Sequence, residues 1–209
     1  MSTSAAHLVA GLGVSRETFE ALEAFAALVK RWNPAINLVS KSAVQKIWDR
    51  HIIDSAQLFA FCPRSASRWI DIGSGGGFPG LVIAILAKEA LPDLRVTLVE
   101  SDQRKATFLR QAVQSLGQTA TVLSKRIEAV PPLEADVISA RALAPLDKLL
   151  GLVVPHLCLD GAALFSKGAR HADELKEARK AWRFGVTIHP SISDPAAAIL
   201  EIRNINREQ

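Results

Sequence analysis

The sequence predicts an α/β fold, a doubly wound and mostly parallel sheet of seven strands preceded by a helical N-terminal extension. Three observations support this prediction. After residue 68, short apolar segments alternate with segments of helical periodicity, as in parallel sheets that are covered by helices on both faces. A glycine-rich segment, residues 73–80, stands between the first strand and the first helix of that region. Before residue 64, apolar residues recur at spacings of three and four, which is typical of amphipathic helices.

The N-terminal extension, residues 1–64, is expected to contain two helical regions. Ser15 is a candidate N-cap for the first region, and the Asn33-Pro34 step is expected to end it. Either Ser40 or Ser42 starts the second region. The apolar stripe of the first helix consists of Phe19, Leu22, Phe25, Val29 and Trp32.

The second domain, residues 65–209, begins after the Cys62-Pro63 step. The expected strands are 69–72, 95–100, 120–123, 136–139, 162–166, 186–189 and 199–203, and the expected helices are 79–90, 103–116, 145–157 and 172–182. The last two strands are expected to form a hairpin. Ligands of such sheets bind beyond the carboxyl ends of the strands, near the point where the strand order reverses.

The composition is that of a globular protein, since 49% of the 209 residues are hydrophobic and 22% are charged. No apolar stretch reaches the roughly 18 residues that span a bilayer, and the first residues lack the basic start of a secretory signal. The two cysteines and five histidines have no ligand spacing, so no metal site is expected. The sequence therefore predicts a cytoplasmic protein without membrane association. Its net charge of +4 suits either a polyanionic partner or a solvated basic surface.

The glycine-rich segment fits two kinds of ligand. Gly73-x-Gly75-x-Gly77 is the form typical of S-adenosylmethionine-binding folds, whereas Gly75-x-Gly77-x-x-Gly80 also satisfies the dinucleotide pattern of NAD-binding proteins. A glycine-rich turn without a ligand is the third interpretation. Glycines in such a loop permit positive φ angles and let a ligand approach the backbone closely.

Two carboxylates flank this segment. Glu100 ends the second strand, where it can bond the ribose hydroxyls of either ligand or be an ordinary strand-end acid. Asp71 precedes the first glycine, where a carboxylate repels a pyrophosphate but can lie near the ammonium group of a methyl donor. The position of Asp71 and the little room left for a second substrate domain favour S-adenosylmethionine over NAD.

The sequence lacks the residues that two common kinds of methyl transfer need. Enzymes of cytosine C5 use a Pro-Cys nucleophile, but the order here is Cys62-Pro63. Enzymes of exocyclic amines carry Asn/Asp-Pro-Pro-aromatic after the fourth strand, where residues 139–142 read Ser-Ala-Arg-Ala. These absences favour an acceptor that needs neither covalent help nor deprotonation, such as guanine N7, so that the protein mainly aligns the reactants.

Cations follow three of the predicted strands. Lys125 and Arg126 follow the third strand and are candidates to bind RNA phosphates. Arg141 and Lys167 follow the fourth and fifth strands, where they either position the reacting groups for catalysis or are ordinary strand-end cations. No residue is expected to act as a general base.

Several segments match one family of known proteins. They are Arg50-His51-Ile52-x-Asp54-Ser55, Asp71 to Gly80, Glu100-Ser101-x-x-x-Lys105, Arg126-Ile127-Glu128, Ser139 to Ala142 and Ser166-Lys167-Gly168. On these residues the chain resembles the bacterial 16S ribosomal RNA methyltransferase G family, also called glucose-inhibited division protein B. The resemblance implies a Rossmann-like class I methyltransferase that uses S-adenosylmethionine to methylate N7 of guanine 527 in 16S rRNA, as free rRNA or within the 30S subunit.

The resemblance also implies roles for individual residues. Gly73 and Phe78 would contact the donor, Ile127-Glu128 would flank its adenine, and Arg141 would lie at the edge of the donor or the acceptor. The donor site would be completed by Asp71, Gly75, Gly77 and Glu100.

The segment around His51 has two interpretations. Arg50 and His51 are candidate RNA contacts, whereas together with Asp54 they can equally form a structural cluster that fixes the N-terminal helices onto the core. For the whole protein, the alternative functions are an NAD-binding oxidoreductase and a catalytically silent RNA-binding module on the same fold. No protein partner is inferred.

Overall fold

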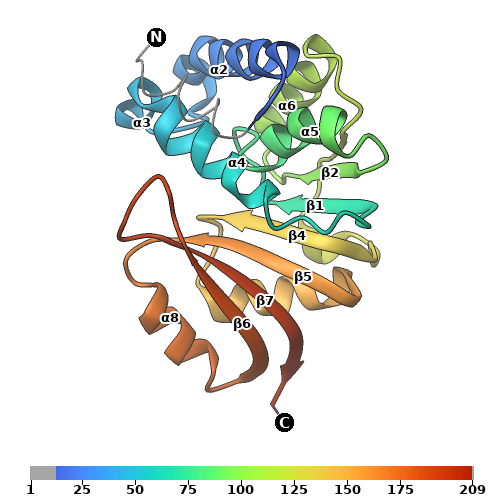
Figure 1. Ribbon diagram of the computed structural model, residues 1–209, viewed down its shortest axis with the longest axis vertical. Helices are drawn as coiled ribbons and strands as arrows, with labels where there is room; N and C mark the ends of the chain where they lie inside the picture. The colour runs from blue at the N-terminus through green and yellow to red at the C-terminus, as the bar shows by residue number, and fades with distance from the viewer. Residues whose placement is uncertain (1–12, 209) are drawn as a thin grey trace.

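The computed structural model describes residues 13–208 and shows one seven-stranded sheet in the order β3-β2-β1-β4-β5-β7-β6 (Figure 1). The strands are β1 (Arg68–Ile72), β2 (Arg95–Val99), β3 (Thr121–Leu123), β4 (Ala135–Arg141), β5 (Leu157–Lys167), β6 (Trp182–Pro190) and β7 (Ala198–Arg207). Strands β1 to β5 are parallel, and β7 runs antiparallel to both β5 and β6. This arrangement confirms the predicted fold and the closing hairpin.

Helices cover both faces of this sheet (Figure 1). They are α2 (Arg16–Ile36), α3 (Lys41–Gln45), the π-helix η1 (Trp48–Ile53), α4 (Asp54–Phe59), α5 (Gly80–Ala90), α6 (Gln103–Ser115), the 3-10 turn η2 (Ile127–Ala129), α7 (Leu146–Val153), the 3-10 turn η3 (Val154–His156) and α8 (His171–Ala178). Residues 1–12 of the expected extension lie outside the described residues.

Side chains of β1 point alternately to two apolar cores because successive residues of a strand face opposite sides of the sheet. Trp69 belongs to the core shared with α2, α4, α5 and α6, whereas Ile70 and Ile72 belong to the core shared with α7 and α8. The strand order reverses between β2 and β4, which both pair with β1. The carboxyl ends of β1 and β4 therefore meet at the expected binding point of a doubly wound sheet.

Helix α2 begins as predicted but ends later than predicted. The hydroxyl of Ser15 accepts a hydrogen bond from the Thr18 amide, as an N-cap should. The expected stop at Asn33-Pro34 is wrong, because the helix continues through Pro34 to Ile36 and ends with Asn37 in the left-handed region. Pro34 removes only one amide donor in the last turn, and the side chain of Asn33 holds the chain beyond by accepting from the Val39 amide at 2.8 Å.

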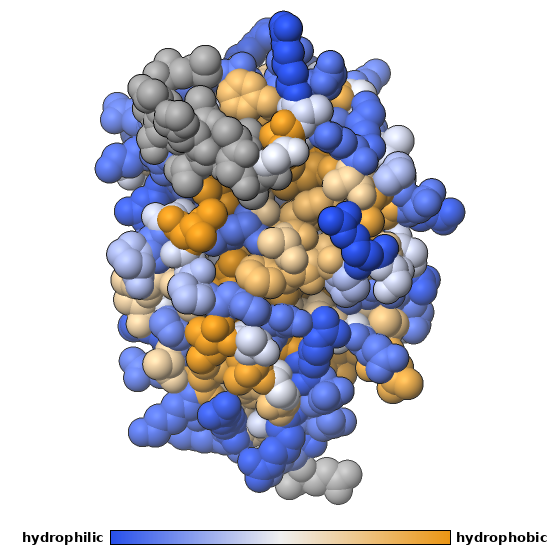
Figure 2. All heavy atoms as spheres, viewed as in Figure 1, coloured by the Kyte–Doolittle hydropathy of each residue, from blue (hydrophilic) through white to orange (hydrophobic). Residues whose placement is uncertain are grey.

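The second helical region begins at Ser40, whose hydroxyl caps α3, and is broken into three pieces. The middle piece is the π-helix η1, which contains Arg50 and His51. Figure 2 shows hydrophobic residues gathered across the centre of one face of the molecule, with hydrophilic residues towards both ends. Among the described residues, no helix is long and apolar enough to cross a membrane.

Candidate active site

The glycine loop connects β1 to α5 at the carboxyl edge of the sheet. Gly73, Gly75 and Gly77 have φ angles of 69°, 53° and 89°, a region that side chains with a Cβ rarely adopt. A Cβ added to Gly75 would meet only the Gly73 carbonyl oxygen, at 3.7 Å, so the backbone here borders open space. The loop can therefore admit a ligand against its backbone at Gly75.

Asp71, in β1, supports the glycine loop through hydrogen bonds. Its side chain is completely buried, and its two carboxylate oxygens accept hydrogen bonds from the Gly80 amide at 3.1 Å and the Ser139 hydroxyl at 2.8 Å. Burial raises the pKa of Asp71 to about 6, against the opposing effect of these hydrogen bonds. Through these two hydrogen bonds, Asp71 connects the end of the loop at Gly80 to Ser139 of β4. A position of Asp71 near the ammonium group of the donor stays a prediction.

Glu100 lies directly after β2 and connects the glycine loop to the start of α6. One carboxylate oxygen accepts from the Gly75 amide at 2.8 Å and the other accepts from the Asp102 amide at 2.7 Å. Glu100 is largely buried, and its own amide donates to the Leu123 carbonyl at the end of β3. Each carboxylate oxygen has a second lone pair available, so Glu100 fits the ribose hydroxyls of a nucleoside ligand.

Phe78 of the loop forms a stack with two further predicted residues, His51 and Arg141. The ring of Phe78 packs against the imidazole of His51 with centroids 4.8 Å apart, and the Arg141 guanidinium lies 5.4 Å from the same ring. Both ring nitrogens of His51 are buried without a hydrogen-bond partner within the protein. Burial, assisted by the charges of Arg141 and Arg50, lowers the pKa of His51 to about 3, so the imidazole is neutral at physiological pH.

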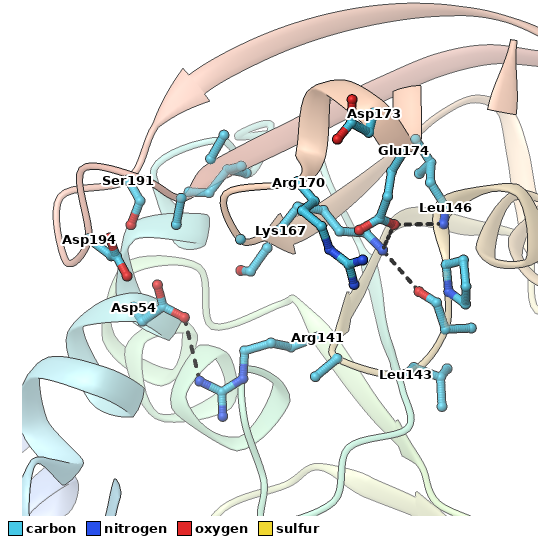
Figure 3. A pocket seen from close by; sticks show the side chains of 18 of the residues that line it. Asp54, Arg141, Leu143, Leu146, Lys167, Arg170, Asp173, Glu174, Ser191 and Asp194 are labelled. Carbon is cyan, nitrogen blue, oxygen red and sulfur yellow. Dashed lines mark hydrogen bonds and ion pairs between the residues drawn. The ribbon is translucent and has the colours of Figure 1, made fainter. Parts of the chain in front are cut away.

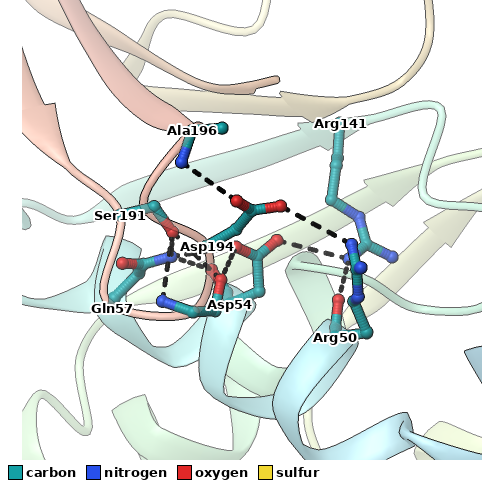
Figure 4. Close-up of polar contacts among 8 residues, drawn as sticks. Arg50, Asp54, Gln57, Arg141, Ser191, Asp194 and Ala196 are labelled. Atoms are coloured by element: carbon teal, nitrogen blue, oxygen red, sulfur yellow. Dashed lines mark hydrogen bonds and ion pairs between the residues drawn. The ribbon is translucent and has the colours of Figure 1, made fainter. Parts of the chain in front are cut away.

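Arg141 is fixed by the N-terminal helices rather than left free (Figure 4). Its guanidinium donates to the Arg50 carbonyl at 3.0 Å and pairs with Asp54 at 3.4 Å. The Asp54 carboxylate in turn accepts from Gln57 at 2.9 Å and from the Ser193 hydroxyl at 2.7 Å. Burial lowers the pKa of Arg141, and the Asp54 carboxylate opposes that shift.

The loop between β6 and β7 also takes part in this network, through hydrogen bonds to Gln57. The amide of Ile192 donates to the Gln57 side chain at 2.9 Å, and Gln57 donates to the Ser191 hydroxyl at 3.1 Å. Asp194 forms a longer ion pair of 3.7 Å with Arg50. Gln57, Ser193 and Asp194 were not predicted, because nothing in the sequence signals that residues 54–57 and 191–194 meet.

A cavity of about 810 Å³ lies beyond the carboxyl ends of β4 and β5 (Figure 3). Its lining includes Arg50, Arg141, Lys167 and Arg170 together with Leu143 and Glu174. The structure therefore brings three predicted residues, Arg50, Arg141 and Lys167, to one cavity. Carboxylates line it as well, so the cavity is of mixed charge and suits a polar base with both donors and acceptors better than a bare phosphate.

The remaining predicted residues follow β3, and they do not line this cavity. Lys125 and Arg126 follow β3 and are exposed, in keeping with their predicted contact with RNA, which stays a prediction. In the 3-10 turn η2, Ile127 is buried and Glu128 is exposed. Within residues 13–208, no group of three or more histidine, cysteine or acidic side chains is placed to hold a metal ion.

The strand order, the glycine loop with Glu100 after β2, and the adjoining cavity define a Rossmann-like methyltransferase fold. Solved methyltransferases share it. A TehB-like SAM-dependent methyltransferase from Corynebacterium glutamicum matches 78% of this chain and 92% of its own with a TM-score of 0.56 at 17% identity. A methyltransferase from Geobacter sulfurreducens matches 88% of this chain and 90% of its own with a TM-score of 0.59 at 12% identity.

The particular family is given by sequence. The family model described as rRNA small subunit methyltransferase G matches residues 18–201. The ribosomal RNA small subunit methyltransferase G of Cereibacter sphaeroides is 53% identical over 192 residues, covering 92% of each chain. That of a Ruegeria species is 51% identical over 196 residues, covering 94% of this chain and 95% of its own.

The chain therefore belongs to the ribosomal RNA small subunit methyltransferase G family. This confirms the resemblance, and it supports S-adenosylmethionine as the cofactor because the fold is shared with methyltransferases that depend on it. The oxidoreductase alternative is excluded by family membership.

Proposed function

We propose that this protein methylates N7 of guanine 527 in 16S rRNA, within the 30S subunit, using S-adenosylmethionine. The observation that supports this most directly is the juxtaposition of two sites at one loop. Residues 142–145 line the mixed-charge cavity, and the side chain of Leu143 also lies against Gly73 of the glycine loop. A donor bound at the glycine loop and a base bound in the cavity would meet at the carboxyl end of β4.

The residues at the glycine loop fit the donor. S-adenosylmethionine would supply the electrophilic methyl group on its sulfonium. Glu100 would hold the ribose hydroxyls, and Gly73, Gly75 and Gly77 would let the donor approach the backbone. Ile127 and Glu128 would flank the adenine, as the resemblance implies. Asp71 would act without touching the donor, by keeping the loop in the conformation that the donor needs.

The acceptor side requires alignment rather than proton removal. Guanine N7 carries a lone pair at neutral pH, so no base has to deprotonate it before attack. The candidate bases near the cavity are poorly suited in any case, because His51 is buried and Asp54 is engaged by Arg141, Gln57 and Ser193. Arg141, which is held in place by Asp54, would orient the base by donating to its O6 atom. Its contribution would be to binding and geometry.

The N-terminal extension, residues 1–64, forms part of this site in the proposal. Arg50 and Asp54 come from that extension and line the cavity together with residues of the domain 65–209. We propose that the extension positions Arg141 and contacts RNA through Arg50, while Lys125 and Arg126 bind phosphates beyond β3. His51 would contribute through its stack with Phe78.

The experiment is methylation of 30S subunits isolated from cells that lack this modification. The protein and labelled donor are incubated with 30S subunits and, separately, with free 16S rRNA, and the methylated nucleotide is mapped. We expect one methyl group per 30S subunit, on N7 of guanine 527, and a rate that varies little between about pH 6 and 9. A methyl group at another atom or nucleotide would overturn the proposal. Donor binding without any transfer would favour the catalytically silent module instead.

A further inference from the structure

The loop between β4 and α7, residues 142–145, lines the cavity and contacts the glycine loop. Ala142 adopts a φ of 51°, a left-handed conformation that is uncommon for a residue with a side chain. The next side chain, Leu143, lies over the backbone of Gly73, since a Cβ placed on Gly73 would come within 2.7 Å of Leu143 Cδ1. Leu143 nevertheless remains 42% exposed. An otherwise solvent-facing leucine thus covers the first glycine of the donor loop.

This conformation is held by one partly buried ion pair. Lys167 Nζ donates to the Ala144 carbonyl at 2.9 Å and pairs with a carboxylate oxygen of Glu174 at 2.8 Å. The same oxygen of Glu174 accepts from the Leu146 amide at 2.9 Å. The two side chains therefore bind the backbone groups on both sides of Pro145, which itself has no amide hydrogen. Figure 3 shows the three contacts converging at the edge of the cavity.

The charge of Lys167 is consequently engaged within the protein. Its side chain is only 8% exposed, against 28% for Glu174, and its donors are directed to Glu174 and Ala144. A lysine in this arrangement is poorly placed to meet an RNA phosphate, although it lines the cavity. Lys167 can therefore affect the reaction only by fixing the loop of residues 142–145.

We propose that Lys167 and Glu174 are positioning residues, which fix the 142–146 segment so that Leu143 flanks the point where the methyl donor and the target base meet. This inference rests on the proposed function and assigns to Glu174 a part that the sequence did not suggest. A methyl transfer needs in-line approach of the acceptor. A shift of the 142–146 segment by about 1 Å therefore lowers the rate of methyl transfer even when both substrates are bound. Neither Lys167 nor Glu174 touches the reacting atoms.

The first test needs no substrate. Glu174→Gln removes the charge of the pair with little change in shape, and Glu177→Gln is the matched control, one turn further along α8 and paired with exposed Lys180. We expect faster hydrogen exchange at the amide of Leu146, which donates to Glu174, in Glu174→Gln, and unchanged exchange there in Glu177→Gln. Equal exchange in all three proteins would overturn the proposal whatever the protein methylates.

The second test measures the reaction in single turnover, with saturating donor and 30S subunits. Leu143→Ala, Glu174→Gln, Lys167→Met and the double variant of the pair are each expected to lose about 10- to 100-fold in rate, with donor affinity changed much less. The double variant should lose no more than the worse of its two single variants, because the pair acts as one unit.

If a variant of the Lys167–Glu174 pair fails to fold, Leu143→Ala still tests the proposal, because Leu143 is half exposed and its replacement should not prevent folding. A full rate for folded Leu143→Ala would overturn the proposal. So would a Lys167→Met variant that keeps its rate but loses RNA affinity with a smaller salt dependence, since Lys167 would then be a phosphate ligand. An unmethylated guanine 527 with wild-type protein, by contrast, would count against the proposed function alone.

Discussion

At the scale of single residues, the buried imidazole of His51 makes stability depend on pH. Its pKa of about 3 lies below the ordinary value of 6.5, so the unfolded chain binds a proton that the folded protein rejects as pH falls below about 6.5. Stability is therefore lost on the acid side. We expect urea unfolding to show that, between about pH 7.5 and 5, the wild-type protein loses up to about 2 kcal/mol more than His51→Phe. Equal losses would show that His51 does not carry this dependence.

Gly75 provides a second test at this scale, with a matched control in Gly13. Both have positive φ angles, 53° and 63°, and among residues 13–208 neither has an atom within 3.5 Å of the place where a Cβ would stand. Alanine at either position should cost about 1–2 kcal/mol of backbone strain. Only Gly75→Ala should also weaken binding of the demethylated donor, by tenfold or more, because its methyl group occupies the ligand's space. Titration calorimetry separates the two, and equal affinities would remove Gly75 from the donor site.

At the scale of elements, the contact between α4 and the loop 191–197 should control how firmly Arg141 is held. Gln57→Leu removes the bonds to Asp54, Ser191 and Ile192. We expect faster hydrogen exchange in residues 191–197 and a methylation rate several-fold lower, because Asp54 loses a partner. Gln118→Leu is the control, since that side chain donates to the nearby Leu116 carbonyl and has no other hydrogen bond within the part of the chain that the structure describes. Unchanged exchange in Gln57→Leu would contradict this role.

The same scale shows what the sequence could and could not predict. Strands, helices and the glycine loop were predictable because alternation, helical period and positive φ are local properties of the chain. The π-helix at Trp48–Ile53 was not, since its extra residue per turn leaves no period in a short segment. The contacts that hold Arg141 through Asp54 were missed for another reason. Ser193 lies 139 residues from Asp54, and such contacts depend on the packing of the whole sheet.

At the scale of the whole molecule, the net charge of +4 predicts binding to RNA that weakens with salt. Replacing exposed Lys125 or Arg126 with alanine should reduce the slope of log affinity against log salt by about 0.7–0.9 each, if each neutralises one phosphate. Arg95→Ala is the matched control, because Arg95 is also exposed but begins β2, at the opposite edge of the sheet. Filter binding between about 50 and 200 mM salt measures the slopes. If Arg95→Ala changed the slope as much as Lys125→Ala or Arg126→Ala does, the protein would not bind RNA through one particular face.

The position of β7 has a consequence for synthesis of the protein. This strand follows β6 in the chain yet lies between β5 and β6, and its first residues, Ala198 and Ile199, line the cavity. A nascent chain whose residues from 198 onward are still inside the ribosomal exit tunnel lacks an interior strand, so neither the sheet nor the cavity can be completed. The cavity can therefore form only after all seven strands, β7 included, have left the exit tunnel.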